Sequence, residues 1–247
     1  MQLFHAETIS KKFPDANNFC LKNVSFDIFQ NDFMLIAGAN GSGKTTLMHI
    51  VAGLEKQTSG KIIFYPDEKK SKKKLRIGLV FQNADAQILG DTVFDDVRFG
   101  PAHFLKNKNE IEAISLYAIS KMNLQSRMNV SCDALSGGEK RRLAVASILA
   151  MGSEVIIFDE PFANLDFPSC KMLRSVMRDL HNDGKTIICL THEIEKVFSL
   201  ANRVLVLCEG EKVFDGNVKE VLQKNLNEWK IENPFDALRD WDLEKIL

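Results

Sequence analysis

Long apolar runs are missing from this sequence of 247 residues. No stretch approaches the roughly 20 consecutive apolar residues that a membrane-spanning helix needs. The amino terminus, Met1 to His5, also lacks a basic segment followed by an apolar one. We therefore expect neither a membrane span nor a secretion signal.

Cysteine pairs are missing as well. The five cysteines, Cys20, Cys132, Cys170, Cys189 and Cys208, are scattered, odd in number and without a C-x-x-C pair. This pattern argues against a disulfide framework and a zinc site, and it indicates a reducing compartment. We expect five small side chains that are buried or partly buried.

An excess of charge of one sign is the third missing feature. The 32 Lys and Arg residues against 33 Asp and Glu residues give a formal net charge of −1. Bulk electrostatics therefore predict no nucleic-acid partner. The lysine-rich run at residues 69–74 is the local exception. It follows the turn-like sequence Tyr65-Pro66-Asp67-Glu68, so a solvated hairpin tip is expected, and contact with lipid stays open.

The order of apolar and amphipathic segments predicts an α/β fold without internal repeats or low-complexity linkers. Strands are expected at residues 3–9, 24–28, 33–37, 61–65, 77–81, 155–158, 186–190 and 204–208. Helices are expected at residues 44–54, over much of 91–128, and between the strands at 155–158 and 186–190. Strands that alternate with helices predict a mainly parallel sheet covered on both sides. The helical middle, roughly residues 83–150, would form an inserted lobe.

A glycine-rich loop follows the expected strand at 33–37. Its sequence is Gly38-Ala39-Asn40-Gly41-Ser42-Gly43-Lys44-Thr45-Thr46. This is G-x-x-x-x-G-K-[ST] between a strand and an amphipathic helix, the setting in which backbone N–H groups cradle phosphates. Lys44 can reach the β- and γ-phosphates, and the Thr45 hydroxyl can bind Mg²⁺. The motif predicts a nucleoside triphosphate site.

Two acids end the apolar segment at residues 155–158. Buried strands rarely end in paired carboxylates unless a cation awaits them. Beside a phosphate loop, Asp159 fits a Mg²⁺-directed residue, and Glu160 fits the group that polarises the attacking water.

The sequence Leu135-Ser136-Gly137-Gly138-Glu139 precedes a helix that starts with Lys140-Arg141-Arg142. The order of phosphate loop, LSGGE, IIFDEP, ANLD and TH resembles the nucleotide-binding subunit of ATP-binding-cassette (ABC) proteins, over nearly the whole chain up to about residue 216. The resemblance implies an ABC ATPase domain at residues 1–216. Its mainly parallel core would carry an N-terminal antiparallel β subdomain and the helical lobe, and residues 217–247 would form a helical tail.

In this family two cassettes close head to tail around two ATP molecules. The resemblance implies that Ser136, Gly137 and Gly138 of one chain contact the nucleotide held by the other. One chain carries two half-sites that cannot meet each other, which implies a dimer, either of identical chains or with a related ATPase.

The resemblance also assigns single residues. Asp166 falls in the loop that crosses the dimer interface, and His192 matches the histidine that contacts the γ-phosphate. Gln82 matches the glutamine that reaches Mg²⁺ and the attacking water. Phe13 lies where the family stacks an aromatic ring on adenine, although core packing is the rival interpretation and Phe19 is an alternative. With Lys44, Gln82, Asp159, Glu160 and His192 all present, we predict Mg²⁺-dependent ATP hydrolysis.

Three functions fit such a cassette: a motor of a membrane transporter, an ATPase that acts on DNA or the ribosome, and a nucleotide-dependent scaffold. The short spacing between Lys44 and Leu135, the single cassette and the intact acids favour transport. Residues 81–87, FQNADAQ, and residues 92–101, TVFDDVRFGP, resemble segments of energy-coupling-factor ATPases, with Ala84 in place of the usual proline. That resemblance implies import of a vitamin or of a metal ion such as cobalt. It also implies a transmembrane coupling subunit, a substrate-capturing membrane subunit and a place at the cytoplasmic face of the membrane.

Overall fold

The computed structural model describes residues 1–65 and 74–233. Most of the lysine-rich run at 69–74 and the end of the expected tail, 234–247, lie outside these residues. The chain divides into two compact units. We call Tyr65–Cys189 the helical unit, and Gln2–Phe64 with Leu190–Leu247 the P-loop unit.

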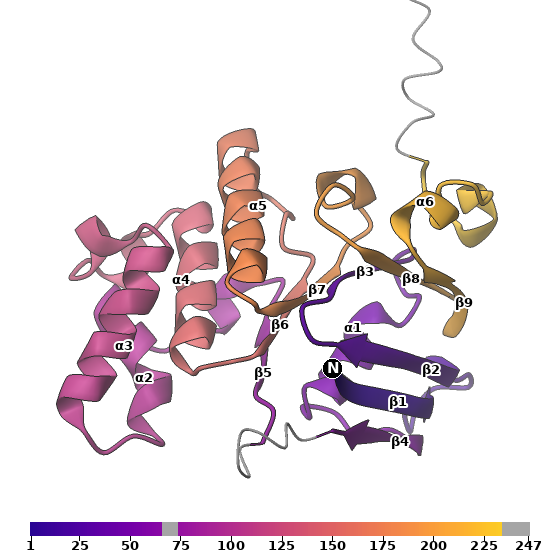
Figure 1. Cartoon of the computed structure of the whole chain (residues 1–247), viewed down its shortest axis with the longest axis horizontal. Coiled ribbons are helices and arrows are strands. Elements are labelled where there is room, and N and C mark those ends of the chain that lie inside the picture. The colour runs from indigo at the N-terminus through magenta and orange to yellow at the C-terminus, as the bar shows by residue number, and fades with distance from the viewer. Residues whose placement is uncertain (66–73, 234–247) are drawn as a thin grey trace, which may run out of the picture. The chain divides into compact units, whose positions relative to one another are not determined.

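The P-loop unit begins with an antiparallel sheet of β1 (Gln2–Lys11), β2 (Leu21–Phe29) and β4 (Ser59–Phe64) in the order β2-β1-β4 (Figure 1). Phe4 lies opposite Ile28 on one side and Phe64 on the other. The rings of Phe4 and Phe26 meet edge to face with centroids 6.1 Å apart. Phe4, Phe26 and Ile28 are buried together between these strands, whereas Phe64 is exposed.

The strand that leads into the glycine-rich loop is β3 (Phe33–Ala37), and all its residues are buried. It pairs in parallel with β8 (Arg203–Cys208). An antiparallel strand that was not predicted, β9 (Glu211–Gly216), follows β8. Every residue of β9 is exposed or only partly buried, so its sequence is largely polar. It therefore lacks the apolar pattern from which a strand can be predicted.

Helix α1 (Lys44–Val51) ends before the expected boundary at residue 54. Ala52 caps it, and Gly53 adopts a left-handed conformation with φ 75°. Glycine carries no steric penalty there, so it terminates the helix. After β9 come α6 (Val218–Val221) and the short 3₁₀ helix η5 (Leu226–Trp229), and Trp229 packs on Phe214 with ring centroids 5.9 Å apart. Another 3₁₀ helix of this unit is η4 (Ile194–Lys196).

The helical unit contains β5 (Ile77–Val80), β6 (Val155–Asp159) and most of β7 (Thr186–Leu190), in the order β5-β6-β7. β5 and β6 are parallel, with Val80 opposite Phe158. Because both strands run in one direction, the segment after Val80 and the acids after Phe158 leave the same edge of the sheet.

Between β5 and β6 lie α2 (Val93–Ala102), α3 (Lys108–Lys121) and α4 (Gly137–Ala150), which pack against one another (Figure 1). The 3₁₀ helices η1 (Ala84–Ala86), η2 (Gln125–Arg127) and η3 (Cys132–Ala134) connect them. Helix α5 (Phe167–Asn182) links β6 to β7. Within residues 1–65 and 74–233, no helix combines the length and apolar character needed to cross a bilayer.

Candidate functional site

The glycine-rich loop has the backbone that close phosphate approach requires. Gly38 has φ 153°, and Gly43, the N-cap of α1, has φ 100°. A Cβ added at Gly38 would collide with the Leu207 carbonyl and lie 2.6 Å from Ser42 Oγ. Only glycine fits at Gly38, so the loop can turn its N–H groups inward above the start of α1.

Two polar side chains of this loop, those of Lys44 and Ser42, are buried. Lys44, 6% exposed, folds back and donates from Nζ to the carbonyls of Gly38 (2.7 Å) and Ala39 (3.2 Å). Ser42 Oγ is buried, and no residue within the described part of the chain forms a hydrogen bond with it. A phosphate oxygen would satisfy this hydroxyl, so the residues present fit a nucleotide.

Phe13 lies in a loop that returns to the start of α1. The loop is closed by Cys20 N, which donates to Lys11 O at 2.7 Å, and Cys20 Sγ lies 3.4 Å from Thr46 Oγ1. Lys11 Nζ lies 4.8 Å from the centroid of the Phe13 ring. Phe13 is 38% exposed, so the rival expectation of core packing is not met, and its ring is available for stacking. Phe19 is exposed as well.

His192 belongs to the same unit. Its neighbour Thr191 donates from its backbone N to Ile36 O at 3.3 Å. The histidine therefore follows a residue that is tied to β3, the strand that leads into the glycine-rich loop. Its own side chain is exposed.

The acids of the helical unit lie at the end of β6. Asp159 is 5% exposed and Glu160 7% exposed. Glu160 has a left-handed backbone with φ 43°, which is unusual for a residue other than glycine, asparagine or aspartate. Burial, reinforced by the charges of Glu160 and Asp159, raises the pKa of the Cys189 thiol well above its usual value. The Cys189 thiol of β7, which interacts with these two carboxylates, is therefore neutral.

Ser136 caps α4 through a reciprocal pair of hydrogen bonds. Its Oγ accepts from Glu139 N at 3.3 Å, and its own N donates to Glu139 Oε2 at 2.8 Å. Glu139 also accepts from Arg127 Nε at 2.9 Å, and these hydrogen bonds, the Ser136 backbone bond first, lower the pKa of Glu139. Ser136 and Gly137 are exposed. The positive end of α4 therefore faces solvent, where an anion from a second molecule can reach it.

Asp166 has a structural role that sequence reasoning did not assign. Its carboxylate caps α5 by accepting from Ser169 N at 3.0 Å, and hydrogen bonds with Ser169, the side-chain bond first, lower its pKa. Asn164, two residues before Asp166, has φ 60°. The turn before α5 is thereby fixed, and Asp166 remains exposed.

Gln82 is exposed near the start of a polar segment, residues 81–90. Gln87 closes this segment: its Oε1 accepts from Phe81 N (3.0 Å), and its Nε2 donates to Leu79 O (3.2 Å). Asn83 caps η1 by accepting from Asp85 N at 3.1 Å. The side chains of Asn83 and Gln87 thus form hydrogen bonds with the backbone of their own segment, whereas the Gln82 side chain is exposed.

Asp96 anchors the far end of the segment and was not singled out from the sequence. This carboxylate is 5% exposed. It accepts from Leu89 N (2.7 Å), from Gly90 N (3.0 Å) and from Ser147 Oγ on α4 (2.6 Å). The buried Asp96 carboxylate accepts three hydrogen bonds and thus holds the turn before α2 against α4.

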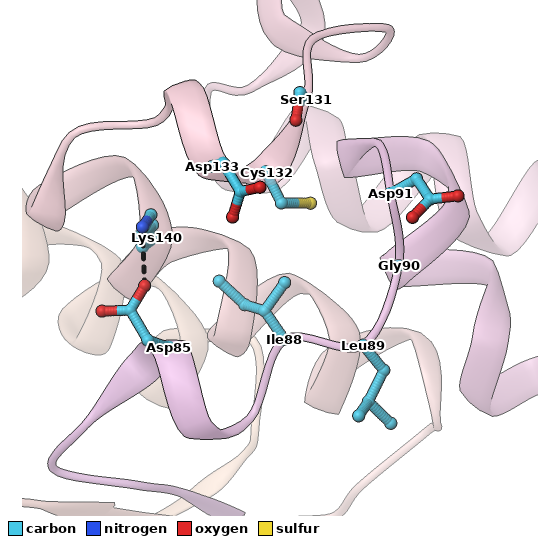
Figure 2. Close-up of a pocket in the computed structure, with 9 residues that line it drawn as sticks. All are labelled: Asp85, Ile88, Leu89, Gly90, Asp91, Ser131, Cys132, Asp133 and Lys140. Carbon is cyan, nitrogen blue, oxygen red and sulfur yellow. Dashed lines mark hydrogen bonds and ion pairs between the residues drawn. The ribbon is translucent and has the colours of Figure 1, made fainter.

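A groove of about 300 Å³ opens beside this turn (Figure 2). Its carboxylates come from Asp85, Asp91 and Asp133, and its one cation among the lining residues, Lys140, is paired with Asp85 at 2.6 Å. Ile88 and Leu89 add apolar surface. The groove thus presents an excess of negative charge beside apolar contacts.

The sequence predicts Lys140 and Arg141 only as the start of a helix, yet both side chains contact the segment after β5. Lys140 pairs with Asp85, and Arg141 Nη1 donates to Phe81 O at 2.5 Å. One signal in the sequence could have found them: cations in the first turns of a helix oppose its dipole. Lys140 and Arg141 are therefore expected to be paired with acceptors that offset this repulsion.

Each unit gathers part of the predicted residue set. The P-loop unit holds Phe13, Gly38, Ala39, Asn40, Gly41, Ser42, Gly43, Lys44, Thr45, Thr46 and His192. The helical unit holds Gln82, Ser136, Gly137, Gly138, Asp159, Glu160 and Asp166.

Known proteins resemble this chain over most of its length. The model of the ABC transporter family matches residues 21–163. The energy-coupling factor transporter ATP-binding protein EcfA1 of Mycoplasma mobile is 37% identical over 242 residues, which cover 94% of this chain and 87% of that protein. Among solved structures, cbiO1 of Clostridium perfringens, part of the ABC transporter complex cbiONQ, has a TM-score of 0.79 at 29% identity and covers 96% of this chain and 97% of its own. The cassette MJ0796, solved as a dimer bound to ADP and Pi, has a TM-score of 0.75 at 26% identity, covering 87% and 99%.

This chain belongs to the ABC transporter family, as an ATPase of a transporter. The predicted class of fold, a P-loop cassette with an antiparallel subdomain and a helical insertion, is thereby confirmed. ATP is the nucleotide that such a domain binds and hydrolyses.

Proposed function

We propose that this chain is the ATP-hydrolysing motor subunit of an energy-coupling-factor type importer that takes up a vitamin or a transition-metal ion such as cobalt. The observation that carries the proposal is the segment at residues 81–101. It resembles that branch in sequence, and it is folded around Gln87 and Asp96 into a fixed loop with an exposed Gln82. The names of EcfA1 and cbiO1 among the relatives support the same branch.

The proposed partners are a second ABC ATPase, identical or related, a transmembrane coupling subunit and a substrate-capturing membrane subunit. The exposed N-terminus of α4 supports the second ATPase, because Ser136 and Gly137 lie at the surface, where the positive end of a helix can bind an anion. The acidic groove of Asp85, Asp91 and Asp133 supports a coupling subunit that inserts a basic, partly apolar segment from the cytoplasmic side of the membrane.

Each site residue is proposed a role by its chemistry. Gly38 to Thr46 and Phe13 would bind phosphates and adenine, and Ser136, Gly137, Gly138 and Asp166 would contact nucleotide across the dimer. The oxygens of Thr45, Gln82 and Asp159 suit Mg²⁺, which prefers hard oxygen ligands and neutralises charge on the phosphates when bound. Glu160 would accept a proton from the attacking water, with Gln82 and His192 orienting water and γ-phosphate.

Isolation of the tagged chain from membranes, followed by identification of the proteins that accompany it, tests this function. We expect a second cassette and a multi-span coupling protein. A small substrate-capturing membrane protein in the same complex would identify the substrate class through its bound ligand. Recovery of ribosomes or of DNA-repair proteins in their place would overturn the transport function.

A further inference from the structure

We propose that Arg141 is a positioning residue for Gln82, through which the helix that follows Ser136 controls the backbone of the Gln82 segment. The inference rests on the proposed role of Gln82 in hydrolysis. It assigns to Arg141, so far only part of a basic helix start, a place in the same reaction without contact to the nucleotide.

The residue before Gln82 has both of its backbone polar groups engaged by side chains. Phe81 N donates to Gln87 Oε1 at 3.0 Å, and Phe81 O accepts from Arg141 Nη1 at 2.5 Å. The Gln87 contact is local, whereas the Arg141 contact comes from α4. The backbone from which Gln82 departs is therefore fixed on one side by its own loop and on the other by the helix of Ser136.

A second contact from α4 reaches the other side of Gln82. Lys140, the neighbour of Arg141, pairs with Asp85 at 2.6 Å. Consecutive side chains of one helix thus hold the chain before and after Gln82. Because α4 is a rigid element that starts at Gly137, a displacement of its first turn must carry Phe81 and Asp85 with it.

Fold stability alone accounts poorly for Arg141. The residue is 5% exposed, and its Nε is buried with no hydrogen-bond partner among the described residues. Burial lowers its pKa, and the charge of Asp159 opposes that shift. An incompletely paired buried cation costs more than an apolar side chain of similar size. Arg141 lies on α4, donates to the Phe81 carbonyl and interacts electrostatically with Asp159. A positioning role for Arg141 accounts for this cost.

Arg142 provides a matched control. It is the next residue of α4, it is partly buried, and burial likewise lowers its pKa. Its Nε also donates to a backbone carbonyl, that of Met122 at 3.0 Å, but this carbonyl follows α3 and lies outside the Gln82 segment. Loss of a buried guanidinium in α4 can therefore be separated from loss of the contact with Phe81.

The experiment measures steady-state ATP hydrolysis by the isolated complex with Arg141→Gln, Arg141→Lys, Arg142→Gln and Gln82→Ala, and with Arg141→Gln combined with Gln82→Ala. We expect Arg141→Gln to lower kcat by about 10- to 100-fold, the range of small misplacements at a catalytic site, with KM for ATP unchanged. Arg141→Lys should recover part of kcat, because it keeps a charged donor. Arg142→Gln should keep the wild-type kcat.

The combined variant decides how Arg141 acts. If Arg141 works through Gln82, Arg141→Gln should add no further loss once Gln82 is Ala. Multiplying losses, or an equal loss with Arg142→Gln, would overturn the inference and leave the proposed function intact. Absence of ATP hydrolysis by the wild-type complex would instead contradict the proposed function. If Arg141→Gln does not fold, the same comparison is made with Arg141→Lys.

Discussion

At the scale of single residues, Glu160 combines burial with a strained backbone. A glutamate held at φ 43° costs about 1–3 kcal/mol, which the surrounding structure must offset. The buried strand β6 and the segment after it provide that support. Glu209 also has a positive φ, 50°, after strand β8, but its side chain is exposed. The combination of burial with this backbone conformation therefore distinguishes Glu160 from Glu209.

Ser42 gives a prediction that separates ligand binding from folding. Its buried hydroxyl has no partner within the described part of the chain, and such a group costs about 1–3 kcal/mol. Ser42→Ala should therefore leave the free energy of unfolding without nucleotide unchanged or higher. It should also weaken ATP binding by about tenfold or more, because a hydrogen bond to a charged group is lost. Denaturant unfolding and nucleotide titration measure the two effects. A less stable variant with normal ATP affinity would contradict this role.

At the scale of elements, Asp96 should be the main anchor of the segment before α2. Asp96→Ala removes a charged acceptor and leaves the Leu89 and Gly90 N–H groups and the Ser147 hydroxyl without it. We expect a loss of about 1.5–3 kcal/mol in the free energy of unfolding, measured by denaturant titration. Asp91→Ala, an exposed groove carboxylate, is the control and should leave stability unchanged. Equal effects of the two substitutions would contradict the anchor.

The position of Gln82 in this segment predicts that its substitution affects substrate uptake and ATP affinity differently. Gln82→Ala leaves the glycine-rich loop intact. It removes a side chain that is proposed to orient the attacking water and that belongs to the segment whose Asp85 and Asp91 line the groove proposed for the coupling subunit. Uptake of the substrate should fall much more than ATP affinity. Radiolabelled uptake into cells and nucleotide titration of the purified chain give the comparison. Normal uptake by Gln82→Ala would exclude the coupling role.

Contiguous motifs were predictable from the sequence, whereas contacts between distant residues were not. The glycine-rich loop was predicted because Gly38, Ser42 and Lys44 act within one turn of chain. The bond from Arg141 to Phe81 joins positions separated by 60 residues. It exists only because α4 packs against the end of β5. Strand β9 escaped prediction for a related reason: its pairing with β8 supplies the order that its own polar sequence does not.

At the scale of the whole molecule, the half-sites predict the composition of the complex. In the proposed dimer, the exposed N-terminus of α4 contacts the nucleotide that the other chain holds. We expect two cassette chains in each isolated complex, measured by native mass spectrometry, either two copies of this chain or one copy with a related ATPase. A complex with a single cassette would contradict the proposed dimer.

The central claim, that ATP hydrolysis by this chain drives a membrane complex, is tested most directly at Glu160. The measurement is the steady-state ATPase rate of the isolated complex with Glu160→Gln, which keeps the shape of the side chain and removes its basicity. The rate should fall by about 10²-fold or more, the usual contribution of a general base, while ATP still binds. An unchanged rate would contradict the role of Glu160 and with it the proposed mechanism.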